Sequence, residues 1–81
     1  MEGFGKFSIN MAKSLLGKNV NLHLKDGSVI VNVLVAEIQK GDFGAKVFVK
    51  CSPYRRRNTF RIPLKSIAWA ELLNLDLILA N

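Results

Sequence analysis

The sequence predicts a mainly β protein: a short N-terminal helix followed by a five-stranded, strongly bent antiparallel sheet of the small-barrel kind. Apolar residues follow a helical spacing only near the N-terminus, and from about residue 19 onward they alternate with polar residues. Asp26-Gly27 is the strongest hairpin signal, because Gly accepts a positive φ at no steric cost. The 81 residues are expected to form one domain, with the helix at about 8–16, the barrel at about 18–72 and an apolar tail at 73–81.

The predicted helix begins after Ser8, whose hydroxyl can accept a hydrogen bond from a free backbone N–H. Ile9, Ala12 and Leu15 fall on one face. Gly17 stands where a left-handed residue commonly ends a helix. A helix this short is unstable alone, so we expect it to pack on the sheet.

The alternation predicts five strands, at residues 19–25, 28–39, 45–51, 59–64 and 67–72. The second strand is apolar on both faces in its first part, which is typical of a strand covered on both sides. One face is expected to carry Val29, Val31, Val33 and Val35, and the other Ile30, Leu34, Ala36 and Ile38. The strand is long, and a bend or bulge is expected near Asn32.

Three features near the C-terminus complete the predicted fold. Pro63 has no N–H for a ladder bond, so we expect it at a strand end or a free edge. Trp69 is expected in the core or in a subunit contact. The tail, residues 73–81, also alternates and fits either a sixth strand or a helical turn. Because an exposed apolar strand is an aggregation hazard, we expect the tail to pack on the barrel or on a neighbouring subunit.

The charge balance favours a polyanionic partner. Twelve Lys and Arg against six Asp and Glu give a net charge of +6. Five cations and a Tyr fall within residues 50–61, where Arg supplies bidentate donors for phosphate and Tyr a stacking surface. The predicted nucleic-acid-binding residues are Tyr54, Arg55, Arg56, Arg57, Arg61, Lys50, Lys46, Phe43 and Lys65. RNA is the expected ligand, and DNA is the alternative.

Other interpretations of the same residues remain open. The basic loop also fits contacts with acidic groups on a partner protein, and Phe43 fits a cap on the barrel end. The whole chain therefore also fits a protein–protein assembly module or a small duplex-DNA-binding protein of the chromatin type. Enzyme activity is not expected, because His23 is the only histidine and no nucleophile motif or carboxylate pair accompanies it. No metal or other cofactor is expected either.

The expected location is the cytoplasm. The single Cys51 excludes an internal disulfide and favours a reducing compartment. The N-terminal residues lack the apolar core of a signal peptide. No apolar run approaches the roughly 20 residues that span a bilayer, so no membrane association is expected.

The segment from Gly17 to Ser28, an alternating strand that runs into a Gly turn, resembles the first motif of the Sm-like family, which includes Sm proteins and bacterial Hfq. The resemblance implies RNA binding by a ring of six or seven subunits, in which the fourth strand of one subunit pairs with the fifth of the next. It also implies base stacking near Phe43. The residues that clasp a base in the family are mostly absent: Asn32 replaces a Gly, and Pro63-Leu64 replaces an Arg-Gly. Other small barrels of the SH3-like kind share the pattern.

Overall fold

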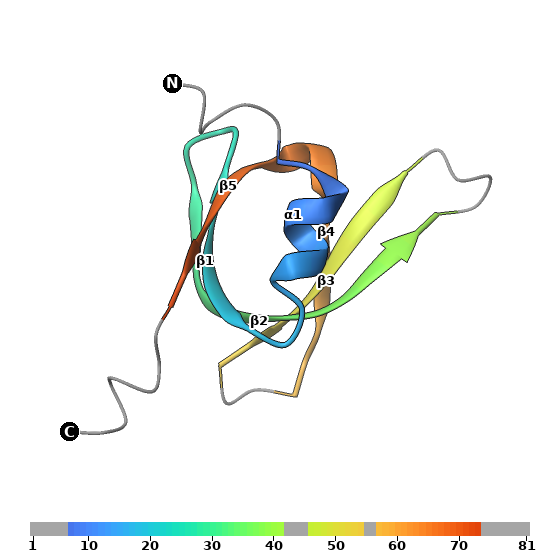
Figure 1. Ribbon diagram of the computed structural model, residues 1–81. Coiled ribbons are helices and arrows are strands. Elements are labelled where there is room, and N and C mark those ends of the chain that lie inside the picture. Colours follow the sequence, from blue (N-terminus) through green and yellow to red (C-terminus); the bar gives the residue numbers. More distant parts are fainter. Residues whose placement is uncertain (1–6, 42–45, 55–56, 74–81) are drawn as a thin grey trace.

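The computed structural model of the chain describes residues 7–41, 46–54 and 57–73 (Figure 1). Its elements are, in order, α1 (Ile9–Ser14), β1 (Asn19–Leu24), β2 (Val29–Lys40), β3 (Val47–Pro53), β4 (Phe60–Pro63), the 3₁₀ turn η3 (Leu64–Ser66) and β5 (Ile67–Leu72). The predicted class, a short N-terminal helix followed by five antiparallel strands, is confirmed. Within the described ranges, no helix is long and apolar enough to cross a membrane.

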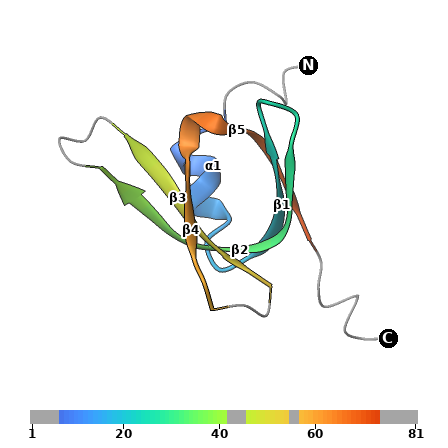
Figure 2. The ribbon, with the colours of Figure 1, turned by 180° about the vertical axis from the view of Figure 1, so that it is seen from behind.

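The strands form one sheet with the order β4-β3-β2-β1-β5. Although β4 and β5 are consecutive in the chain, β4 pairs with β3 and β5 pairs with β1, and the single turn η3 connects them. They therefore occupy the two edges of an open sheet, and the prediction of a closed, strongly bent barrel is wrong for the described strands. The two edges are visible from the front and from behind (Figures 1 and 2).

The helix α1 packs against β2 and is capped as predicted. The backbone N–H of Met11 donates to Ser8 Oγ at 3.1 Å, and Ala12 is buried against the sheet. The helix ends earlier than expected, and Gly17 follows with a φ of 79°, the left-handed conformation that the sequence predicts there. The N–H of Gly17 donates to Val35 O at 2.8 Å, which fixes the end of the helical segment on β2.

A bulge at Asn32 divides β2 into two parts. Asn32 has a φ of 52°, and between two successive pairs β2 advances by three residues while β1 advances by two. The extra residue moves the alternation by one position, so Val31 is 68% exposed whereas Val33 is 1% exposed. The predicted bulge is confirmed. The predicted common face is wrong, because Val29 and Val31 lie outside while Val33 and Val35 lie inside.

Two further register shifts also change the face of the sheet from which the following side chains project. One lies on β2 at Ala36, so Ile38 packs against the core although it is three residues from buried Val35. The other lies on β5 next to Ile67, where β5 advances by two residues while β1 advances by one. Ile67 is therefore buried while Trp69 is 37% exposed, so Trp69 is not in the core, and the alternative prediction, a subunit contact, stays a prediction.

The core lies between α1 and the inner face of the sheet. Its buried residues are Ala12, Val20, Leu22, Val33, Val35, Val49, Cys51, Ile62 and Ile67. Pro63 is the last residue of β4, an edge strand, as its missing N–H predicts. The N–H of Leu73 donates to Asn19 O at 2.9 Å. The prediction for the rest of the tail, residues 74–81, lies outside the described residues.

Candidate nucleic-acid interface

Lys50 on β3 and Arg61 on β4 are direct partners in the antiparallel ladder. Directly opposed residues project from the same face of a sheet, so the two cations are neighbours on the outer face. Lys50 Nζ lies 3.9 Å from Glu37 Oε1 on the other neighbouring strand. Arg61 has a different partner: its guanidinium carbon lies 5.0 Å from the centre of the Phe48 ring. The face thus combines two cations with an aromatic ring.

The outer face is hollowed around this pair. A shallow cavity of about 330 Å³ lies beside it. Its lining residues are Gln39, Lys50, Thr59, Phe60 and Arg61. Cations and uncharged polar groups at the same hollow can contact a phosphate and its neighbouring sugar together.

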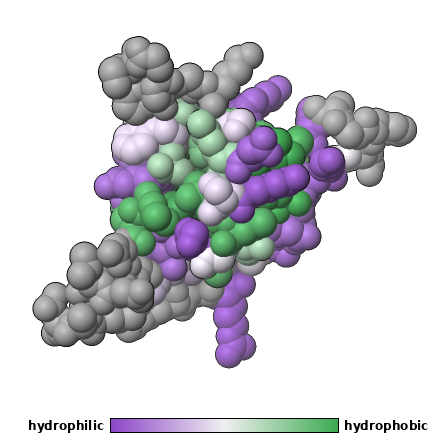
Figure 3. Space-filling model, viewed as in Figure 1, coloured by the Kyte–Doolittle hydropathy of each residue, from purple (hydrophilic) through white to green (hydrophobic). Residues whose placement is uncertain are grey.

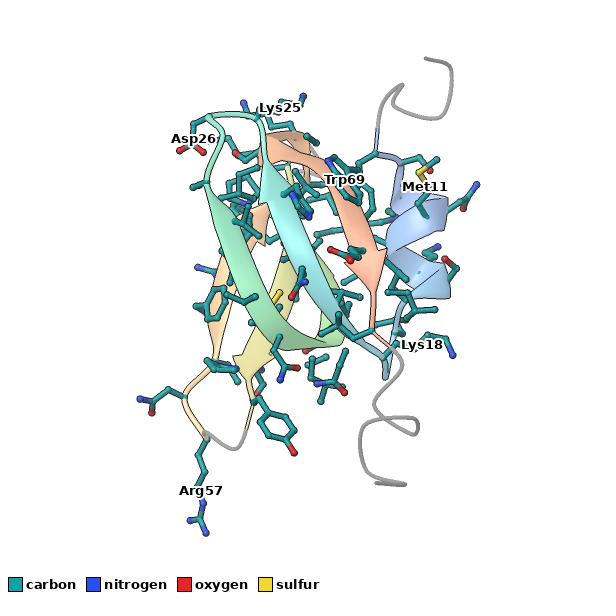
Figure 4. All side chains as sticks on the ribbon, turned by 90° about the vertical axis from the view of Figure 1, so that its left-hand side faces the viewer. Met11, Lys18, Lys25, Asp26, Arg57 and Trp69 are labelled. Carbon is teal, nitrogen blue, oxygen red and sulfur yellow. The ribbon has the colours of Figure 1, made fainter. Side chains whose placement is uncertain are left out.

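The predicted basic loop connects β3 to β4 at one end of the sheet. Tyr54 begins the loop and is 39% exposed, and its backbone N–H donates to Asn32 O at 3.1 Å. This bond ties the start of the loop to the β2 bulge. Arg57 extends away from the sheet at this end (Figure 4). Arg55 and Arg56 lie outside the described residues.

A second group of cations lies at the opposite end of the sheet. Lys46 immediately precedes β3, and Lys65 lies in η3. Lys25 joins them, because its backbone N–H donates to Ser66 O at 2.9 Å and so attaches the β1–β2 turn to η3. Figure 4 shows Lys25 and Arg57 at opposite ends of the molecule. Phe43, the remaining predicted contact, lies outside the described residues.

Positive charge therefore follows the β3–β4 side from end to end. Arg57 lies at the loop, the Lys50–Arg61 pair in the middle, and Lys65 at the η3 end. Among the described residues, two acids lie close to this path: Glu37, which contacts Lys50, and Asp26, which lines one hollow together with Arg61 and Lys65. The sequence predicted most of these cations, but it missed Lys25 and Phe48, whose positions depend on pairing between distant segments.

Asp26, next to Lys25, is engaged within its own turn. Its carboxylate accepts from the Ser28 hydroxyl at 2.6 Å and from the Ser28 backbone N–H at 2.9 Å. These two bonds lower the pKa of Asp26, the hydroxyl bond having the larger effect. The carboxylate is therefore ionised at neutral pH and is used to close the hairpin that positions Lys25.

A different surface occupies the outer face of β1, β2 and β5. His23 and Trp69 are cross-strand partners whose rings stack at 3.8 Å and 7°. Glu71 Oε1 lies 3.5 Å from His23 Nε2. Val29 and Val31 are exposed on the same side of the sheet. The alternation in the sequence placed His23 outside, but the stack could not be predicted because the β5 bulge turns Trp69 outward.

The described residues provide little for catalysis. Cys51 is buried in the core, and desolvation raises the pKa of its thiol to about 11, so the nucleophilic thiolate is scarce at neutral pH. Across residues 7–41, 46–54 and 57–73, no group of three His, Cys, Asp or Glu side chains is arranged to hold a metal ion.

Comparison with protein-family models, with curated proteins and with solved structures finds no match for this chain. Within the described residues, the cations are distributed along the whole β3–β4 side of the sheet and do not converge on one point.

Proposed function

We propose that this protein is a non-catalytic module that binds RNA through phosphate contacts along the β3–β4 side. The observation that carries the proposal is the direct opposition of Lys50 and Arg61. Like charges directly across a sheet destabilise it by roughly 0.2–1 kcal/mol relative to neutral pairs. A phosphate bound between them converts this repulsion into attraction for both side chains.

The aromatic residues beside the cations favour RNA with unpaired bases. Tyr54 begins the basic loop and is 39% exposed, whereas the Phe48 ring is only partly exposed and is in contact with Arg61. Exposed aromatic rings stack on unpaired bases, whereas duplex bases are already stacked on each other. Arginine also stacks on bases through its planar guanidinium. Cations and aromatic rings in one strip are the combination found in sequence-tolerant single-strand binders.

We further propose that the module acts as an Sm-like ring. The open sheet leaves β4 and β5 as edge strands with backbone groups available for pairing. Pairing β4 of one subunit with β5 of the next satisfies both edges, as the resemblance to the Sm-like family implies. A ring multiplies the weak contacts of one subunit along a single RNA chain.

Fluorescence anisotropy of a labelled, uridine-rich RNA at several salt concentrations tests the RNA proposal. The test variant is Lys50→Gln/Arg61→Gln, and the matched control is Lys13→Gln/Lys18→Gln, which removes the same charge from exposed positions on and after α1. Each lost phosphate contact lowers the slope of log affinity against log salt by about 0.7 for a single strand. We expect a loss of about 1.4 in the test variant and little change in the control. Equal losses in both variants would contradict the proposed site.

A second function, protein–protein assembly without nucleic acid, is favoured by a separate observation. Val29, Val31 and Leu72 are 46%, 68% and 56% exposed. Apolar surface of this extent on a small chain suits a protein contact. Separate apolar patches, bordered by hydrophilic side chains, lie on the face with α1 (Figure 3). RNA that fails to bind at any salt concentration, together with a multi-subunit mass, would favour this function.

The third alternative is a duplex-DNA-binding protein of the chromatin type. It would be favoured if duplex DNA competes with the labelled RNA as strongly as unlabelled RNA does.

A further inference from the structure

A second hollow in the described part of the molecule lies beside η3 and is lined by none of the cations of the Lys50–Arg61 pair. It has a volume of about 470 Å³, within the range of roughly 300–1,000 Å³ that is typical of small-molecule sites. Phe7, Phe48, Leu64 and Ile67 contribute apolar side chains to its wall. These residues come from the segment before α1, from β3, from η3 and from β5, so the hollow forms only in the folded chain.

Three lysines also line this cavity: Lys25, Lys46 and Lys65. Two of them are attached at the backbone. The N–H of Lys25 donates to Ser66 O at 2.9 Å, and the carbonyl of Lys46 accepts from Gly41 N–H at 2.6 Å. No carboxylate is among the described lining residues, although Asp26 lines a neighbouring hollow that shares Lys25 and Lys65 with this cavity. Mutual repulsion of the lysines is relieved by an anion at this position.

We propose that this cavity binds a single-chain amphiphile, an aliphatic chain with one anionic head group. The apolar wall takes the chain, and Lys25, Lys46 and Lys65 take the head group. The described lining side chains provide hydrogen-bond donors, the three lysines, but no acceptor for the N–H groups of a nucleobase edge. A base in this cavity would leave those N–H groups without a side-chain partner, which is costly in an apolar surrounding. An aliphatic chain has no such polar groups.

This inference goes beyond RNA binding and does not depend on it. Phe48 lines the cavity and also contacts Arg61. The cavity and the Lys50–Arg61 pair are nevertheless proposed to bind different classes of ligand. Lys46 and Lys65 are proposed to contact both the RNA and the head group of the amphiphile. The RNA-binding assay is therefore run on the same variants, so that a variant that loses one ligand and keeps the other shows which of the two proposals fails.

Isothermal titration calorimetry with the full chain tests the inference. The probes are dodecanoate, dodecyl phosphate and neutral dodecanol, each below its micelle concentration, with uridine 5′-monophosphate as the nucleotide probe. We expect at least one of the two anions to bind at one site per chain and dodecanol to bind more than tenfold more weakly. If only dodecanoate binds, the natural ligand is assigned as a free fatty acid. If only dodecyl phosphate binds, the natural ligand is assigned as a phosphate-bearing chain derived from a phospholipid. Dodecanol affinity equal to that of the anions, or saturation by uridine 5′-monophosphate alone, would overturn the inference.

Two variants locate the binding. Lys25→Gln/Lys65→Gln is expected to weaken the anion at least tenfold, while its control, Lys13→Gln/Lys18→Gln, leaves the affinity unchanged. Val47→Trp places a larger side chain in the cavity wall and is expected to abolish binding of the chain. Circular dichroism checks that each variant is folded. If Val47→Trp fails to fold, the affinity of the Lys25→Gln/Lys65→Gln variant still tests the inference. Unchanged affinity in the lysine variant would overturn the inference.

Discussion

Lys50 and Arg61 occupy directly opposed positions on β3 and β4, so two cations share one face of a small sheet. A double-mutant cycle with Lys50→Gln and Arg61→Gln measures their coupling. We expect the pair to be unfavourable by about 0.2–1 kcal/mol at low salt, and the coupling to fall as salt screens the charges. Urea unfolding of the wild type, the two single variants and the double variant gives the coupling free energy. A favourable coupling at low salt would show that Glu37 and Phe48 already compensate both charges.

The positive φ of Asn32 gives a second prediction. Asn19 Nδ2 donates to Asn32 Oδ1 at 3.3 Å, and the Asn32 N–H donates to Asn21 Oδ1 at 2.8 Å. A β-branched residue is strained at a φ of 52°, at a cost of roughly 1–3 kcal/mol. We expect Asn32→Val to be less stable than Asn32→Gly by about this amount in urea unfolding. Equal stability of the two variants would argue against the bulge.

The exposure of two valines on either side of this bulge gives a matched pair of variants. Val31 is 68% exposed and Val33 is 1% exposed. Val31→Thr places a hydroxyl on the surface and is expected to change the free energy of unfolding by less than about 0.5 kcal/mol. Val33→Thr buries the same hydroxyl and is expected to lower the free energy of unfolding by about 1–3 kcal/mol. Thermal unfolding compares them, and the reverse order would mean that the faces are assigned incorrectly.

Cys51 predicts a loss of stability at high pH. Burial raises the pKa of its thiol from 9.0 to about 11 in the folded state. A raised pKa means that the contribution of the thiol is fully present below pH 9 and is lost as the pH rises toward 11. The difference in unfolding free energy between the wild type and Cys51→Ala is therefore expected to shrink over this interval. A difference that stays constant from pH 8 to 11 would indicate an exposed thiol, and rapid alkylation at pH 8 would indicate the same.

The stacked rings of His23 and Trp69 predict a measurable contribution to the β1–β5 pairing. Aromatic pairs contribute about 0.5–1.5 kcal/mol beyond the area that they bury. We expect His23→Ala to destabilise the fold by about this amount and to increase quenching of Trp69 fluorescence by acrylamide. Val31→Ala, at a 68% exposed position on the outer face of the sheet, is the comparison variant. Unchanged quenching in His23→Ala would contradict the stack.

The sequence predicted the elements of the fold better than their faces. Ser8, Gly17 and the Asp26-Gly27 turn are local signals, so the helix cap and the first hairpin followed from them. Asn32 also signalled its bulge, because Asn tolerates a positive φ. The shift next to Ile67 has no such signal, and the outward position of Trp69 was therefore missed.

The candidate site was predictable to a similar extent. The alternation placed Lys50 and Arg61 outside, but their direct opposition depends on the β3–β4 register, which a sequence pattern does not fix. Lys25 was missed because it approaches Lys65 only through the bond between the β1–β2 turn and η3. The residue pattern alone did not predict that β4 and β5 are the edges, since pairing of β5 with β1 joins segments far apart in the chain; only the resemblance to the Sm-like family implied it.

The most direct test of the central proposal is the absolute mass in solution by light scattering, measured with and without a short uridine-rich RNA at low and high salt. We predict a mass of several subunits, an added mass of RNA at low salt, and loss of that RNA as the salt concentration rises. A monomer or dimer whose mass is unchanged by RNA at low salt would contradict both the ring and the proposed function.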